Sequence, residues 1–234
     1  MTGVSPVAPT SPALEPAGEV NARVWRGLYA AGGNDLRYPS DVLVRLGFRL
    51  MRTDRDRRVL DFGFGTGANL LHFAGQGLEV HGVEVSEHAI KRTRQRLESA
   101  GLAAQLQLIE GGQPLPYAAG YFDVVYAWHV LYYNDREGWS RAVGELERVT
   151  KPGGLIIIAI AAPGDVSQLQ AESLGNQLYR SRVPGQEGCV LLIPDRQGLD
   201  ALFPGRPIEV GEFGFSFAGL LARYWIITYR MPTA

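Results

Sequence analysis

The chain has 234 residues, of which 46% are hydrophobic, and this is enough for one sizeable domain around a single core. Its 23 Lys and Arg residues balance its 24 Asp and Glu residues, so the basic excess of duplex-binding proteins is absent and no nucleic-acid partner is expected. Cys189 is the only cysteine, which excludes an intramolecular disulfide, and the longest apolar run, residues 155–162, is far shorter than the roughly 20 residues that span a bilayer. We therefore expect a cytoplasmic protein without membrane association.

The N-terminal part changes in composition near residue 19. Residues 1–18 contain several prolines and almost no charge, and such a segment cannot bury enough apolar surface to order itself, so we predict a disordered tail. Residues 19–234 are expected to form one domain, with 19–52 as N-terminal helices and a lid. Trp25 indicates a helix that packs on the body, and Ser40 is a plausible cap of the next helix.

Strand and helix patterns then alternate, which is typical of a doubly wound α/β sheet. The run 155–161 is apolar without interruption, as a central parallel strand covered on both faces requires. The other expected strands are 59–62, 78–85, 105–109 and 122–127, and the expected helices are 68–74, 86–100 and 136–149.

The pattern stops after residue 162. Residues 163–200 are expected to form an insertion on the substrate side, with a short helix around 168–178. The segments 208–217 and 224–230 are rich in β-forming residues and close in sequence, which favours an antiparallel hairpin at the sheet edge.

A glycine loop follows the first strand and opens a helix, where bare backbone N–H groups can face a ligand. Gly63, Gly65 and Gly67 give Gly-x-Gly-x-Gly, but the same segment also satisfies the dinucleotide fingerprint through Gly63, Gly65 and Ala68. The glycines alone leave S-adenosylmethionine (SAM) and NAD both open.

Two carboxylates accompany the loop. Asp61 ends the first strand, where it would repel a pyrophosphate but would favour the ammonium group of SAM. Glu84 lies 21 residues after Gly63 and can accept hydrogen bonds from both ribose hydroxyls of either cofactor, although a solvated strand-end glutamate is an alternative.

Three segments in order, residues 59–67, 115–125 and 147–158, resemble the class I SAM-dependent methyltransferases, in particular the small-molecule branch. The resemblance implies a Rossmann-like, doubly wound, seven-stranded sheet with an antiparallel C-terminal hairpin, and SAM as cofactor with S-adenosylhomocysteine (SAH) as product. It also implies adenine contacts near Gly111, Gly112 and Gln113, but Gly111 stands where this family usually has an Asp. Phe64 stands where the family usually has a small residue, and would narrow the pocket near the methionine end.

The resemblance implies a cofactor site and a neighbouring catalytic site. At the end of the fourth strand, His129 is either a base with a pKa near neutrality or a hydrogen-bonded structural residue. Tyr132 and Tyr133 orient a nucleophile or pack a lid, and Tyr29 and Tyr38 are lid contacts or core aromatics. The expected catalytic residues are His129, Tyr132 and Tyr133, and the expected cofactor contacts are Tyr29, Tyr38, Asp61, Gly63, Phe64, Gly65, Gly67, Glu84, Val85, Gly111, Gly112, Gln113, Trp128 and His129.

The expected function is methyl transfer from SAM to a small molecule, with N, O, S and C acceptors all open and no metal required. An NAD-dependent oxidoreductase and a catalytically silent SAM-binding protein are the alternatives, and either a monomer or a homodimer is compatible. Phe213, Phe215 and Phe217 are expected to wall the substrate side, and Arg180 and Arg182 could bind an anionic substrate.

Overall fold

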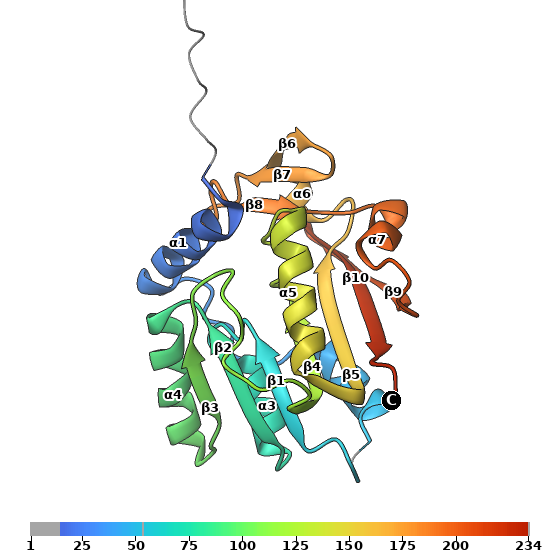
Figure 1. The fold of residues 1–234 in the computed structure, drawn as a ribbon. Helices are drawn as coiled ribbons and strands as arrows, with labels where there is room; N and C mark the ends of the chain where they lie inside the picture. The colour runs from blue at the N-terminus through green and yellow to red at the C-terminus, as the bar shows by residue number, and fades with distance from the viewer. Residues whose placement is uncertain (1–14, 53, 234) are drawn as a thin grey trace, which may run out of the picture.

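The computed structural model describes residues 15–52 and 54–233, so most of the predicted tail, residues 1–14, lies outside the described residues. A seven-stranded sheet confirms the predicted architecture (Figure 1). The first five strands are parallel, and the last two form an antiparallel hairpin at one edge. The strands stand in the order β3 (Gln105–Leu108), β2 (Glu79–Glu84), β1 (Arg58–Phe62), β4 (Phe122–Trp128), β5 (Thr150–Ala161), β10 (Leu220–Arg230) and β9 (Glu209–Phe217).

Helices cover both faces of the sheet because its central strands are apolar on both sides. In β5, Leu155 and Ile157 pack into one buried cluster, while Ile156 and Ile158 pack into the other. The first cluster includes side chains of α2 (Asp41–Leu50), α3 (Ala68–Gly75) and α4 (Glu87–Ala100), and the second includes α5 (Arg136–Val149) and α7 (Arg196–Leu202). This is the two-layer covering that the uninterrupted apolar run predicted.

Helix α1 (Ala17–Ala30) lies across the end of the sheet where the parallel strands finish (Figure 1). Its start corrects the predicted end of the tail at residue 18, since Ala17 is buried in the first helical turn. Pro16 stands just before the helix, a place that suits proline because the first N–H groups of a helix have no intrahelical partner.

The predicted helix around 168–178 is wrong. Asp165 caps a single turn, α6 (Val166–Leu169), and the chain then forms β6 (Ala171–Gly175), β7 (Leu178–Ser181) and β8 (Val190–Leu192) of a small antiparallel sheet. Asn176 and Gln177 both have positive φ, at 50° and 64°. Two such residues between strands make the tight turn of a β-hairpin, so the chain reverses where a helix would have continued.

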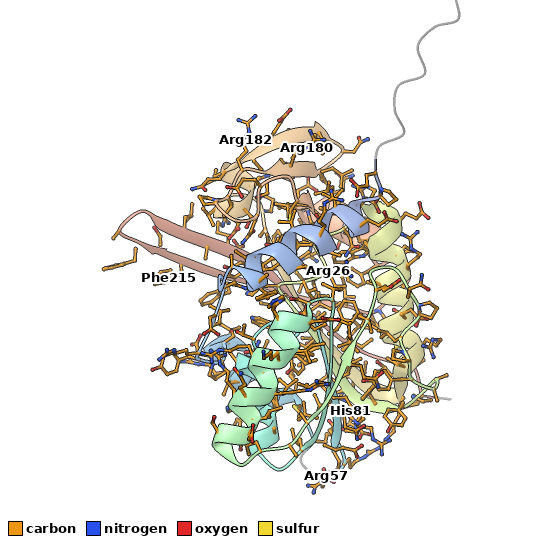
Figure 2. The ribbon with its side chains drawn as sticks, turned by 90° about the vertical axis from the view of Figure 1, so that its left-hand side faces the viewer. Arg26, Arg57, His81, Arg180, Arg182 and Phe215 are labelled. Atoms are coloured by element: carbon orange, nitrogen blue, oxygen red, sulfur yellow. The ribbon has the colours of Figure 1, made fainter. Side chains whose placement is uncertain are left out.

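The β9–β10 hairpin confirms the C-terminal prediction, but its phenylalanines do not share one role. Phe213 stacks on Tyr224 with a centroid distance of 6.3 Å. Phe215 and Phe217 are 49% and 67% exposed, and Figure 2 shows Phe215 on a hairpin that projects from the body. None of the three lines the cleft described below, which corrects their expected place on the substrate wall.

Candidate active site

A cleft opens between α1 and the ends of the parallel strands, and it consists of two adjoining hollows. Counted together with the open solvent at their mouths, their empty volumes are ≈ 730 and ≈ 1030 Å³. The two hollows meet at five residues that line both, namely Trp25, Tyr29, Gly63, His129 and Tyr133.

The glycine loop forms the floor of the cleft between β1 and α3. Gly65 has a φ of 56°, and a Cβ placed on it would lie 2.6 Å from the hydroxyl oxygen of Tyr29. The missing side chain therefore lets a lid tyrosine approach the loop backbone. Gly67 also has a positive φ, of 82°, and directly precedes α3, so it turns the chain into the helix and does not line either hollow.

Asp61 lies at the floor of the second hollow and is 2% exposed. Its Oδ2 accepts a 2.7 Å hydrogen bond from the Tyr126 hydroxyl, the only hydrogen bond to its side chain within the described residues. Burial raises the pKa of Asp61 to about 8, against the opposing effect of the Tyr126 bond. A cation in the cleft would stabilise the ionised carboxylate.

Glu84 lies in the first hollow, where its carboxylate is already hydrogen-bonded to backbone. Its Oε1 accepts from the N–H groups of Val85 and Ser86 at 2.8 and 3.1 Å, and its Oε2 accepts from Gly65 at 3.0 Å. Burial raises the pKa of Glu84, while these three bonds oppose the shift. Since a carboxylate offers about four acceptor positions, one remains on Oε2 for a ligand hydroxyl. This arrangement supports one of the two predicted ribose contacts.

His129 stands where the two hollows meet, in a left-handed backbone conformation with a φ of 57°. Its ring lies 4.1 Å from that of Tyr224, and its buried Nδ1 has no hydrogen-bond partner among the described residues. Burial lowers the pKa of His129 to about 4. The expectation of a pKa near neutrality is therefore wrong, and the imidazole is neutral at pH 7.

Tyr132 and Tyr133 form a short hydroxyl chain on the wall of the second hollow. The Tyr132 hydroxyl donates to that of Tyr133 at 3.2 Å, and the Tyr133 hydroxyl donates to Oε1 of Gln186 at 2.8 Å. Burial raises the pKa of both phenols above the ordinary value, so both stay protonated at neutral pH. They can orient a bound molecule, but they are not bases.

The lid helix is attached by a residue that sequence reasoning missed. Buried Asn21 donates through Nδ2 to the carbonyls of Tyr133 and Val190 at 2.7 and 2.8 Å, and its Oδ1 accepts from the Val190 N–H at 2.8 Å. Trp25, one turn along, meets the Tyr133 ring edge-on at 5.0 Å. A lone Asn in a helix gives no sign of distant partners, so only the fold identifies its role.

The cleft brings together most of the predicted site. Tyr38 is 85% exposed and outside both hollows, and Gln113 lines a neighbouring hollow instead. Arg180 on β7 and Arg182 just after it are both exposed (Figure 2), and Arg182 pairs with Glu172 at 3.2 Å, so neither lines the cleft. The predicted residues that line the cleft are Tyr29, Asp61, Gly63, Phe64, Gly65, Glu84, Val85, Gly111, Gly112, Trp128, His129, Tyr132 and Tyr133.

The unusual size of the residue at position 64, a phenylalanine, has a structural reason. Its side chain is 7% exposed and belongs to the core cluster beneath the cleft, although it also touches the second hollow. A Cβ on Gly82 of β2 would lie 2.4 Å from Phe64 Cδ1, so Gly82 provides the space for the ring. Phe64 therefore packs down into the core more than it narrows the pocket.

Residues 59–154 match the family model of a methyltransferase domain. Over 183 residues the chain is 31% identical to the demethylmenaquinone methyltransferase of Thermus thermophilus, and the match covers 74% of this chain and 78% of that protein. The chain belongs to the class I SAM-dependent methyltransferase family.

Other members of this methyltransferase family match over shorter stretches. The malonyl-[acyl-carrier protein] O-methyltransferase of Pectobacterium atrosepticum is 31% identical over 121 residues, which is 51% of this chain and 45% of that protein. The chain spans about half the length of most of the curated relatives that it matches.

Solved structures support the methyltransferase fold. The 1,6-didemethyltoxoflavin-N1-methyltransferase of Burkholderia thailandensis, solved with 1,6-didemethyltoxoflavin and SAH, superposes with a TM-score of 0.69 at 16% identity, covering 96% of this chain and 93% of that one. Within residues 15–52 and 54–233, no helix has the length and apolarity to cross a bilayer, and no group of His, Cys, Asp and Glu side chains suits a metal ion.

Proposed function

We propose that this chain transfers the methyl group of SAM to a small acceptor that has a flat apolar face and no negative charge. The observation that carries the proposal is the lining of the cleft. Among residues 15–52 and 54–233, no Lys or Arg lines either hollow, whereas Asp61, Glu84 and Asp165 all contribute carboxyl groups. An anionic acceptor would find no cation in this wall to offset the loss of its hydration.

The residues present fit SAM, since the site contains a buried acid, Asp61, that has no cationic partner in the part of the chain that the structure describes. Asp61, whose pKa burial raises to about 8, would bind the ammonium of the methionine part. The free acceptor position on Glu84 would take a ribose hydroxyl, and Val85, Gly111 and Gly112 would border the adenine. When bound, SAM supplies an electrophilic methyl group on a sulfonium sulfur, so the cofactor brings its own activation.

The protein contributes positioning and exclusion of water. The second hollow is walled by the aromatic rings of Trp25, Trp128, Tyr132, Tyr133 and Tyr224, which can hold a planar acceptor between them. Holding two reacting groups in the right geometry can contribute roughly 7–11 kcal/mol to catalysis. These residues would orient the acceptor without reacting with it.

His129 would serve as the hydrogen-bond acceptor for the incoming nucleophile. The neutral imidazole of His129 lines both hollows, so its accessible face can accept from an O–H or N–H group of the acceptor, which draws electron density toward the attacking atom. With a pKa of about 4, His129 orients this proton and is a weak final proton acceptor. Proton release to solvent would follow transfer.

The names of the relatives suggest two acceptor classes. The malonyl-[acyl-carrier protein] O-methyltransferase is named for a carboxylate-bearing substrate, and the demethylmenaquinone methyltransferase is named for a quinone. A wall of aromatic rings without Lys or Arg favours the second class, an uncharged aromatic ring system such as a hydroquinone.

Binding and turnover would test the proposal in two steps. We expect SAH to raise the melting temperature, since a ligand at 100 times its Kd stabilises by about 2.7 kcal/mol, and NAD to leave it unchanged. Stabilisation by NAD alone would favour an oxidoreductase. Transfer of labelled methyl from SAM would then be compared between neutral hydroquinones and the same rings bearing a carboxylate.

We expect the uncharged member of each pair to react faster. Faster turnover of the carboxylated member would contradict the proposed acceptor class. SAH binding without transfer to any member of the panel would favour a catalytically silent SAM-binding protein.

A further inference from the structure

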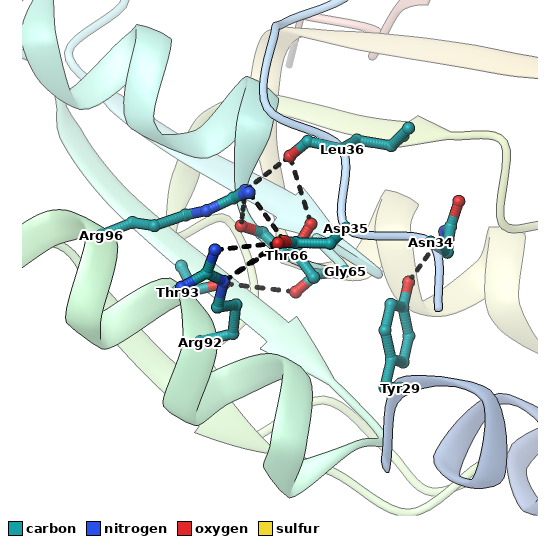
Figure 3. Close-up of polar contacts among 9 residues, drawn as sticks. All are labelled: Tyr29, Asn34, Asp35, Leu36, Gly65, Thr66, Arg92, Thr93 and Arg96. Atoms are coloured by element: carbon teal, nitrogen blue, oxygen red, sulfur yellow. Dashed lines mark hydrogen bonds and ion pairs between the residues drawn. The ribbon is translucent and has the colours of Figure 1, made fainter. Parts of the chain in front are cut away.

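The segment 31–38 joins α1 to α2 and crosses the rim of the second hollow. Asn34 and Leu36 both line that hollow, and Asp35 lies between them with its side chain turned away from the cleft toward α4 (Figure 3). A contact that fixes the position of Asp35 therefore also restricts its neighbours Asn34 and Leu36, which line the hollow.

Two arginines of α4 hold Asp35. Arg92 binds both of its carboxylate oxygens, with its shortest contact at 2.8 Å from Nη2 to Oδ2, and Arg96 Nη2 donates to Oδ1 at 2.7 Å (Figure 3). The Arg92 guanidinium, together with Arg96, holds the pKa of Asp35 below its ordinary value. Forked pairing of this kind fixes geometry as well as charge.

Arg96 also links the segment to the glycine loop. Its Nη1 donates to the carbonyls of Leu36 at 2.5 Å and Thr66 at 2.7 Å, and the Thr66 hydroxyl donates to the same Leu36 carbonyl at 3.3 Å (Figure 3). The Arg96 side chain is only 14% exposed, so water competes weakly for these bonds. One guanidinium thus joins α4, the segment 31–38 and the loop that forms the floor of the cleft.

The alternative is that Arg92 and Arg96 are ordinary charged residues on a solvent-facing helix surface, and this fits the observations less well. Exposed ion pairs contribute little because water screens them and the long side chains lose freedom. Arg94 on the same helix shows that ordinary behaviour, since it is exposed and makes no ion pair within the described residues. Arg96 instead satisfies two backbone carbonyls that lie across the cleft rim.

We propose that Asp35, Arg92 and Arg96 form a clasp that holds the segment 31–38 closed over the methionine half of the cleft and slows release of the cofactor. The slower release of the cofactor, which is the second part of this proposal, rests on the proposed function. In this role the three side chains are positioning residues, because they touch the lid and the loop and not the reacting atoms.

Proteolysis of the ligand-free protein tests the clasp directly. Arg37 is exposed within the segment, so trypsin can cut after it when the segment opens, and the product is a fragment that begins at Tyr38. We expect Asp35→Asn and Arg96→Gln each to raise the initial rate of that cut by roughly tenfold, as the loss of a charged hydrogen-bond network implies. Arg94→Gln is the matched control, since it removes one charge from the same helix, and it should leave the rate unchanged.

Dissociation of SAH, followed by stopped-flow fluorescence of the four tryptophans, tests the second part. We expect both variants to release SAH faster by a similar factor, with the double variant no faster than the faster single one. Arg96→Lys should recover only part of the effect, because an ammonium keeps the charge but not the fork, and it also serves if Asp35→Asn does not fold.

The proposal would be overturned if Asp35→Asn and Arg96→Gln were cleaved by trypsin and released SAH at the same rates as Arg94→Gln. It would also be overturned if both were cleaved faster but released SAH at the wild-type rate. If the wild-type protein does not bind SAH, the proposed function fails, and with it the cofactor part, while the proteolysis rates still decide whether the clasp holds the segment.

Discussion

The Tyr126 hydroxyl donates a 2.7 Å hydrogen bond to Oδ2 of Asp61 beneath the cleft, and both side chains are buried. Tyr126 lies on β4 and Asp61 lies on β1, and the two residues are paired neighbours in the sheet. Because the hydroxyl stabilises the ionised carboxylate, Tyr126 keeps the pKa of Asp61 lower than burial alone would set it.

Removing that hydroxyl should weaken cofactor binding in a pH-dependent way. In Tyr126→Phe we expect the pKa of Asp61 to rise further above 8, so that at pH 7 less carboxylate is available for an ammonium. SAH affinity measured by calorimetry should fall by about tenfold at pH 7, and the deficit should shrink at pH 9. Tyr121→Phe, on a partly exposed tyrosine away from the cleft, is the control. An equal deficit at both pH values would mean that the hydroxyl acts through packing.

Asp61→Asn should stabilise the ligand-free protein while weakening SAH binding. The pKa of Asp61 is about 8 when folded against about 3.9 in an unfolded chain, so its contribution to stability is fully present below about pH 4 and is lost as the pH rises toward 8. The Asp61→Asn variant cannot ionise at this position, so its stability does not fall in this way as the pH rises. Its melting temperature should exceed that of the wild type most clearly at pH 8, by about 2–4 °C for each kcal/mol regained.

Adding SAH should reverse that order of stability, because only the wild type has the carboxylate. Because the two proteins differ only at residue 61, the difference between their melting temperatures reports on Asp61 and not on other titrating groups. A wild type that is more stable than Asp61→Asn at pH 8 without ligand would show that Asp61 is not a strained buried acid.

The pH profile of turnover should lack a neutral pKa from His129. Because burial lowers the pKa of His129 to about 4, its imidazole stays neutral down to about pH 5. With SAM saturating, we expect kcat to stay flat between pH 5 and pH 8 as far as this group is concerned. His129→Ala should lower kcat by roughly 10²-fold without changing SAH affinity by more than a few-fold. An inflection near pH 6.5 that disappears in His129→Ala would restore the neutral base.

Gly82 and Phe64 should be coupled in stability. A Cβ at Gly82 lies 2.4 Å from Phe64 Cδ1, so Gly82→Ala should cost about 1–3 kcal/mol by overpacking in urea unfolding. Combining it with Phe64→Ala should cost clearly less than the sum of the single changes, since the closer of the two clashing side chains is gone and only Leu70 Cδ1, at 2.7 Å, remains. Gly144→Ala, at an open helical position, is the matched control and should be neutral or stabilising. Additive single and double effects would mean that Phe64 does not occupy the Gly82 space.

The fold was predictable where a local pattern carried the information. The apolar run in β5 predicted a strand covered on both faces, and Ser40 and Ser86 both accept the capping hydrogen bonds expected of them. Asp61 and Glu84 line the cleft as their positions at strand ends predicted, because parallel strands bring their carboxyl ends to one edge.

What local patterns could not predict depends on contacts between distant segments. His129 owes its low pKa to burial, and the ring packed on it is Tyr224, from the hairpin at the far end of the chain. Tyr38 is aromatic and near the lid in sequence, yet its side chain is exposed and lines neither hollow. Within residues 168–178, the Gly175–Asn176 pair is a turn signal, and the turn that it makes prevails over the helical pattern around it.

The bonds of Asn21 also set an order of assembly during synthesis. Its partners Tyr133 and Val190 lie 112 and 169 residues later in the chain, so α1 emerges from the ribosome long before either is made. Closing such long loops is slow compared with forming local contacts. Nascent chains would thus make all five parallel strands, which end at Ala161, before the Val190 bonds can attach α1 over the cleft. A chain that stalls before residue 190 would present an open cleft to the cell and would retain cofactor poorly.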